Sequence, residues 1–96
     1  MAVDDEPARV LSLTLTNIRG LHARAAAKFV QTVERHEAEV TVEKDGQTVS
    51  GRSIMGLLML GAGVGTSIAV TIEGSDRDEA AAAIKALVDD RFGEVE

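Results

Sequence analysis

Apolar and polar residues alternate in three stretches of the chain, and this period of two is typical of strands that bury one face. The stretches are residues 11–15, 38–43 and 68–72. An Asp-Gly pair at 45–46 is a common hairpin turn, so residues 47–51 are predicted to return as a further short strand. The pattern therefore predicts a sheet of four strands.

A period between three and four residues predicts three helices. The first covers residues 23–34, the second is short and runs from Ser53, which can cap it, to Leu60, and the last is capped by Ser75 or Asp76. The apolar face of the first helix is made by Ala26, Phe29, Val30 and Val33. The predicted buried face of the last helix is made by Ala80, Ala81, Ile84, Leu87 and Val88.

The predicted elements follow one another in the order β-α-β-β-α-β-α, which places the chain in the α+β class. This order indicates an open-faced β-sandwich, a four-stranded antiparallel sheet with three helices on one face. We expect a single domain at 9–93, preceded by a flexible acidic tail at 1–8 and followed by a short C-terminal tail at 94–96.

The composition narrows the classes of function. Phe29 and Phe92 are the only aromatic residues and the formal net charge is −6, which together argue against a nucleic-acid partner. The chain has no cysteine, which excludes disulfides and thiolate chemistry. The acidic start does not resemble a signal peptide, and no apolar run approaches the length of a membrane span. We therefore expect a soluble cytoplasmic protein without membrane insertion.

His22 lies where the connection at 17–20 gives way to the first helix. The first N–H groups of a helix lack partners within it and attract anions. A phosphoryl group on His22 would reach the backbone N–H groups of Ala23 and Arg24, and the Arg24 guanidinium would add a charge-assisted contact. From the local pattern alone, a solvated loop histidine or a helix cap is the commoner interpretation. His36, the only other histidine, lies in a charged segment where we expect it to be solvated, so no metal site is expected.

Two segments together carry a family resemblance: Gly-Leu-His-Ala-Arg at 20–24 and Arg-Ser-Ile-Met-Gly at 52–56. They resemble the signature of HPr, the histidine phosphocarrier family of the phosphoenolpyruvate-dependent phosphotransferase system, and the resemblance spans roughly residues 9–93. It implies that enzyme I donates a phosphoryl group to Nδ1 of His22, and that the carrier passes it to an EIIA-type protein. It also implies that Arg24 is the active-site arginine and that the carrier needs no metal or organic cofactor.

The chain departs from the family pattern at Ala25, where many members have proline after the arginine. Proline suits the first helical turn, whereas alanine restores an N–H donor and is a good helix former. We expect the site to survive with altered phosphate stability. Residues 57–60 resemble the nitrogen-related branch of the family and 90–94 resemble proteobacterial HPr, so sugar uptake and nitrogen regulation both remain open.

Ser53 opens the short helix, and its side chain is predicted to be the N-cap. The resemblance adds a regulatory role, because the matching serine of related proteins is phosphorylated by HPr kinase/phosphorylase. A phosphate at this helix N-terminus would be tolerated by the fold. It would place negative charge on the surface that meets enzyme I.

The short helix carries more apolar residues than one buried face requires, and we expect Leu57 and Leu60 to enter the core. The remaining four are predicted to form a partly exposed docking patch beside His22: Ile54, Met55, Leu58 and Met59. A wider buried stripe is the alternative. The family's interaction surface uses the matching positions, which favours docking.

The glycine-rich segment 61–66 lacks the spacing of a nucleotide-binding loop and follows a helix, so we interpret it as a flexible connection. Two functions remain in competition at this stage. The first is a monomeric phosphocarrier. The alternative is a regulatory binding module that keeps the fold and acts by protein contact without phosphotransfer.

Overall fold

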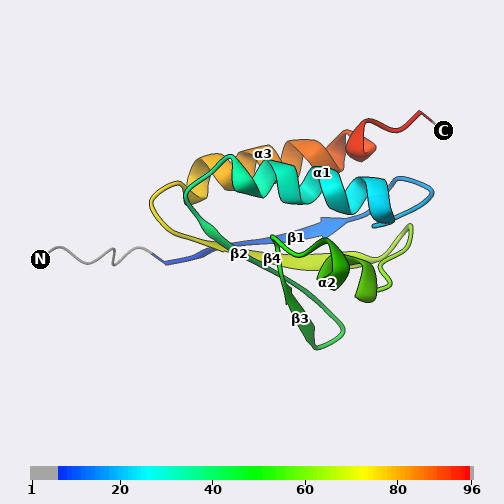
Figure 1. Ribbon diagram of the computed structural model, residues 1–96, viewed down its shortest axis with the longest axis horizontal. Helices are drawn as coiled ribbons and strands as arrows, with labels where there is room; N and C mark the ends of the chain where they lie inside the picture. The colour runs from blue at the N-terminus through cyan, green and yellow to red at the C-terminus, as the bar shows by residue number, and fades with distance from the viewer. Residues whose placement is uncertain (1–6, 96) are drawn as a thin grey trace, which may run out of the picture.

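A four-stranded antiparallel sheet forms one layer of the protein, whose computed structural model describes residues 7–95 (Figure 1). In chain order the strands are β1 (Arg9–Thr14), β2 (Glu39–Lys44), β3 (Gln47–Ser50) and β4 (Ser67–Glu73), and in the sheet their order is β1-β4-β2-β3. The outermost strands of the sheet are therefore β1 and β3. Most of the predicted acidic tail lies outside the described residues.

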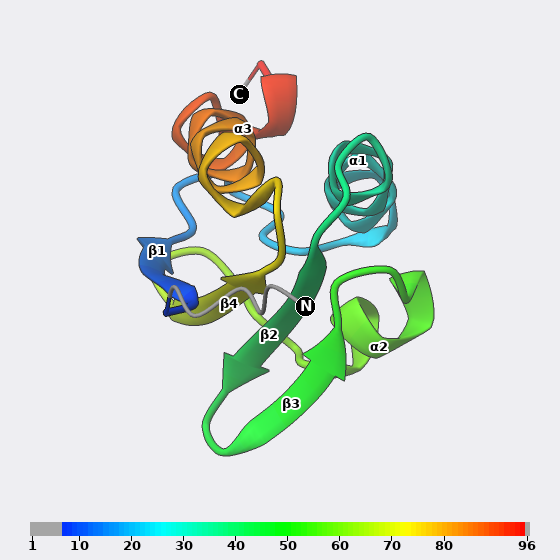
Figure 2. The ribbon, with the colours of Figure 1, turned by 90° about the vertical axis from the view of Figure 1, so that its left-hand side faces the viewer.

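Three α-helices cover the sheet: α1 (Ala23–Glu34), α2 (Ile54–Met59) and α3 (Arg77–Asp89). Figure 2 shows α1 and α3 side by side over one face, with α2 on the side of α1 and next to β3. A 3-10 turn, η1 (Arg91–Gly93), follows α3. The predicted element order and open-faced α+β architecture are confirmed.

Strand register explains why only one face of the sheet is apolar. Opposite residues of antiparallel strands point to the same face, and β1 runs beside β4 with Leu11 opposite Val70 and Leu13 opposite Ile68. Beyond β4, the buried Val42 of β2 lies opposite Val70. The buried side chains therefore form continuous rows under the helices. Phe29 and Phe92, the two aromatic residues, are both fully buried among aliphatic side chains.

Three sequence predictions need correction. Leu87 is half-buried at the margin of the core, because α3 turns it partly toward solvent. His36 is also half-buried, and its Nδ1 donates a 3.0 Å hydrogen bond to the carbonyl oxygen of Thr32, one helical turn back. Asp76 occupies the N-cap position of α3 without a side-chain cap bond, since its carboxylate accepts from the Glu37 backbone N–H instead.

No helix in the described part of the chain is long and apolar enough to cross a bilayer.

Candidate functional site at the start of the first helix

His22 is the N-cap residue of α1, as its position in the sequence predicts. Its backbone is extended (φ −79°, ψ −178°), and its carbonyl oxygen accepts the first helical hydrogen bond from Ala26 at 2.8 Å. The side chain makes no cap bond to the helix, so the imidazole is directed to other groups. It is 23% exposed, which leaves one part of the ring accessible and buries the rest.

The chain reaches His22 through a tight turn that only glycine fits. Gly20 has φ of 61°, and a Cβ there would lie 2.4 Å from the carbonyl oxygen of Ala62. The same oxygen accepts a 2.9 Å hydrogen bond from the Leu21 N–H. The segment before α1 is therefore fastened to the connection between α2 and β4, and this fixes where the helix begins.

The imidazole of His22 makes a short contact through Nε2 with the carboxylate of Glu94, which lies beyond α3. Asn17 Nδ2 donates to the other carboxylate oxygen at 3.1 Å and to the Gly20 carbonyl at 2.8 Å. Asn17 is fully buried. The histidine, the glutamate and the asparagine thus form one connected polar group built from both ends of the chain.

The electrostatics of this group keep Glu94 ionised. Burial would by itself raise the pKa of the Glu94 carboxyl, but hydrogen bonds from His22 and Asn17 and the nearby charges of His22 and Arg19 outweigh burial and lower that pKa. A carboxylate only accepts hydrogen bonds. Because Glu94 is ionised at neutral pH, Nε2 of His22 must be the donor, and the lone pair of a neutral ring lies on Nδ1.

An unusual turn brings Glu94 back to the site. Arg91, Phe92 and Gly93 have φ of 56°, 55° and 73°, so three successive residues adopt the left-handed region. For residues with a Cβ this conformation costs about 1–2 kcal/mol each. Burial of the Phe92 ring and a 2.6 Å hydrogen bond from Lys28 Nζ to the Phe92 carbonyl oxygen stabilise the turn.

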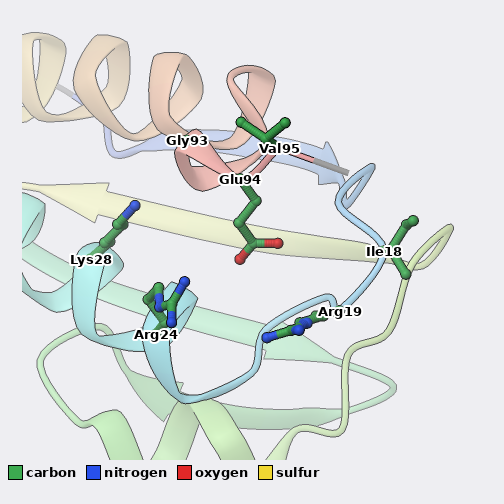
Figure 3. Close-up of a pocket in the computed structure, with 7 residues that line it drawn as sticks. All are labelled: Ile18, Arg19, Arg24, Lys28, Gly93, Glu94 and Val95. Atoms are coloured by element: carbon green, nitrogen blue, oxygen red, sulfur yellow. The ribbon is translucent and has the colours of Figure 1, made fainter.

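Cationic side chains line a cavity next to this polar group. Arg19, Arg24 and Lys28 line a cavity of about 410 Å³ together with Glu94. Figure 3 shows Arg24 and Lys28 on α1 and Arg19 on the preceding loop, with the Glu94 carboxylate directed toward the space between them. An anion in this cavity would lie beside the first turns of α1 and would be attracted by the helix N-terminus and by these positive charges.

Ser53 is the N-cap of α2, and its hydroxyl oxygen accepts a 2.9 Å hydrogen bond from the Gly56 N–H. After it, Leu57 is fully buried and Leu60 nearly so, as predicted. The docking patch is partly exposed: Met55 and Met59 are 70% and 68% exposed, Ile54 is 41% exposed and Leu58 is half-buried. The wider buried stripe is therefore wrong for this helix.

The sequence interpretation named His22 and Arg24 but did not name four further residues of the site: Asn17, Arg19, Lys28 and Glu94. Glu94 falls in the segment assigned to a C-terminal tail, although its side chain is largely buried against His22. No local signal marks a contact between residues 72 positions apart. The one sequence signal for Asn17 is an asparagine at the start of a loop with a glycine three positions later. Within residues 7–95 no three metal-binding side chains cluster.

Comparisons with known proteins agree with this geometry. Residues 11–90 match the family described as "PTS HPr component phosphorylation site". The chain is 45% identical over 82 residues to a phosphocarrier protein HPr of Xylella fastidiosa, covering 85% of this chain and 92% of that protein. It is 43% identical over 82 residues to a phosphocarrier protein NPr of Shewanella violacea, covering 85% and 90%.

Solved structures give the same result. The crystal structure of an HPr from Thermoanaerobacter tengcongensis superposes with a TM-score of 0.87 at 39% identity, covering 92% of this chain and 99% of that one. The fold and the partly exposed histidine near a cation-lined cavity are those of a small carrier domain for a phosphoryl group. The chain belongs to the HPr family, the phosphocarrier components of the phosphotransferase system.

Proposed function

We propose that this protein accepts a phosphoryl group from enzyme I on Nδ1 of His22 and donates it to an EIIA-type protein. The observation that carries the proposal is the hydrogen bonding and the exposure of the His22 imidazole. Its Nε2 is occupied by Glu94, while the ring stays 23% exposed at the start of α1. A neutral imidazole with a free lone pair is a competent nucleophile near neutral pH.

The start of α1 supplies the phosphate contacts. The backbone N–H groups of Ala23 and Arg24 lie in the first turn, where helical N–H groups have no partner in the helix. The Arg24 side chain is exposed and lines the cationic cavity, so it can approach a phosphoryl group without displacing core residues. The helix dipole contributes about 0.3–1 kcal/mol at exposed sites, which favours a phosphoryl group without trapping it.

Partner proteins dock on α2 in this proposal. Met55 and Met59 project from the helix and are largely exposed, and α2 packs against α1, which carries the site. Flexible methionine side chains suit a surface that must bind a donor and an acceptor in turn. In this proposal the domain acts in the cytoplasm as a monomer.

Ser53 is the regulatory position in this proposal, phosphorylated by HPr kinase/phosphorylase. Its hydroxyl accepts from the Gly56 N–H and is half-buried, so a phosphate there would sit against the N-terminus of α2. The added charge lies on the first turn of the docking helix. It would weaken the approach of an acidic partner without unfolding the helix.

In this proposal the output of the carrier is either sugar uptake or nitrogen-related regulation. The chain is similar both to proteins named HPr and to a protein named NPr. The two branches differ in the EIIA-type acceptor. A direct comparison of phosphotransfer to a sugar-specific and a nitrogen-related acceptor, each at equal concentration, distinguishes them by the faster rate.

The proposal is tested by incubating the protein with enzyme I and phosphoenolpyruvate. We expect one acid-labile, base-stable phosphate per chain, and its loss in His22→Ala with the fold retained. His36→Ala is the matched control, because it removes the only other imidazole. Equal labelling of His22→Ala and the unsubstituted protein would refute the assignment.

A further inference from the structure

We propose that Glu94, oriented by Asn17, is a positioning residue that keeps the His22 proton on Nε2 and thereby presents Nδ1 as the nucleophile. The inference rests on the proposed role of His22 and deepens it. It gives a function to Asn17, in the loop before α1, and to Glu94, which follows η1. Neither residue belongs to α1 or to the docking patch.

The first argument is the direction of the hydrogen bond. Glu94 offers only acceptors in its ionised form, so the bond requires a proton on Nε2. In the absence of such a partner, a neutral imidazole exchanges between two tautomers, and the one protonated on Nδ1 has no lone pair there. A fixed acceptor at Nε2 therefore increases the fraction of chains that are ready to receive a phosphoryl group.

The second argument is the burial of Asn17. Its Nδ2 bridges the Gly20 carbonyl and Glu94, and so ties the glutamate to the same loop that leads into His22. Its Oδ1 is buried and has no hydrogen-bond partner among the described residues. A buried acceptor without a partner destabilises the fold, so an asparagine at this position needs an explanation, and the two hydrogen bonds of its Nδ2 supply one.

The third argument is the backbone that delivers Glu94. Arg91 and Phe92 adopt the left-handed region although neither is glycine. Strain of this kind is found where surrounding contacts enforce it, and such positions cluster at functional sites. Here the enforced turn reverses the chain after α3 and brings the Glu94 carboxylate within hydrogen-bonding reach of the His22 ring and Asn17.

The fourth argument is the charge that the transfer creates. The Nδ1 lone pair forms a bond to phosphorus, the bond between phosphorus and the donor atom breaks, and that electron pair stays on the donor. The Nε2 proton remains on the ring, so the phosphorylated ring is positively charged. The Glu94 carboxylate already accepts that proton's hydrogen bond and stabilises the positive ring.

The direct test is the tautomer of His22 in the unphosphorylated full-length protein, measured from the ¹⁵N chemical shifts of its ring. We expect Nε2–H to dominate in the unsubstituted protein and both tautomers to be populated in Glu94→Ala. Glu34→Ala is the matched control, because it removes an exposed carboxylate of α1 away from the site. An unchanged tautomer ratio in Glu94→Ala would overturn the proposal.

Transfer kinetics give a second readout. A hydrogen bond to a charged group is worth about 1.5–3 kcal/mol, and because His22 is partly exposed we expect the lower end, roughly a tenfold slower acceptance from enzyme I in Glu94→Ala. The slowing should appear in the maximal rate, with little change in the affinity for enzyme I. A variant that transfers at the unsubstituted rate contradicts the role of Glu94 and leaves His22 as the phosphorylated residue.

Asn17 is tested through its dependence on Glu94. If Asn17 acts by orienting the glutamate, Asn17→Ala should slow transfer in the unsubstituted protein, and the same substitution should change the rate less than twofold in the Glu94→Ala background. Equal slowing in both backgrounds would show that Asn17 acts only through the loop at Gly20. Lack of labelling in every variant, the unsubstituted protein included, would refute the proposed function, whereas the tautomer measurement would still decide the positioning role.

Discussion

Lys28 donates a 2.6 Å hydrogen bond from Nζ to the carbonyl oxygen of Phe92, and thereby fastens η1 to α1, the helix that His22 caps. The two residues are 64 positions apart. Phe92 itself is anchored in the core. The contact explains how residues after α3 keep a fixed place beside the first turn of α1.

Lys28→Met keeps the length of the side chain and removes this hydrogen bond. We expect a loss of about 1.5 kcal/mol in the free energy of unfolding, because the bond has a charged donor. We also expect slower phosphotransfer, because Glu94 follows the released turn. Urea unfolding and the enzyme I assay measure the two effects. Lys85→Met is the control, since its ion pair with Asp89 is exposed, and a loss as large as that of Lys28→Met would contradict the interpretation.

Gly20→Ala should be strongly destabilising, because a Cβ would lie 2.4 Å from the Ala62 carbonyl oxygen in addition to the cost of a positive φ. Gly61→Ala is a matched control: its φ is 63°, and no atom lies within 4 Å of the added Cβ. The control should lose about 1–2 kcal/mol, and Gly20→Ala should lose more by at least about 1 kcal/mol. Chemical denaturation measures both, and equal losses would argue against the close approach of the loop to Ala62.

Ser53→Ala removes the cap of α2 and should cost about 1 kcal/mol of stability. Ser75→Ala changes the same type of residue at an exposed position before α3 and should alter stability by less than about 0.5 kcal/mol. Ser53→Asp keeps a capping oxygen, so it should retain the fold while weakening acceptance from enzyme I. Titration calorimetry that gave equal affinity for the aspartate variant would contradict docking on α2.

Glu94 should make stability depend on acid. Its pKa in the folded protein lies below the ordinary value of about 4.5, so its contribution is complete above that value and is lost as the pH falls through the lowered pKa. Glu94→Gln lacks this contribution. The stability difference between the unsubstituted protein and Glu94→Gln should therefore shrink between about pH 5 and about pH 3, and a constant difference would contradict the lowered pKa of Glu94.

The sequence predicts the frame of this protein well, because strands and helices here follow simple periods. Alternating residues at 68–72 became the central part of β4, and the apolar face of α1 is buried as its spacing requires. Ser53 is the cap that its residue type and position indicate. Residue periods and capping preferences were sufficient for these elements, because each depends on residues close together in the sequence.

Contacts between distant segments were beyond those rules. Arginine and phenylalanine rarely adopt a positive φ, so nothing in the sequence at Arg91 and Phe92 predicts that the chain reverses there. The bond from His36 to Thr32 was also missed, because a charged segment suggested full solvation. Tertiary packing decided both outcomes. Asn17 and Glu94, which hydrogen-bond around His22, lie outside the helices and strands, where sequence patterns are least informative.

The central claim is that Nδ1 of His22 carries the phosphoryl group. Phosphorylation of ¹⁵N-histidine-labelled protein by enzyme I and phosphoenolpyruvate, followed by ¹⁵N and ³¹P NMR, tests it most directly. The account predicts that one phosphorus is bonded to Nδ1 of His22 and that the His36 ring signals do not move. A phosphorus bonded to Nε2 of His22, to His36 or to a hydroxyl oxygen would contradict it.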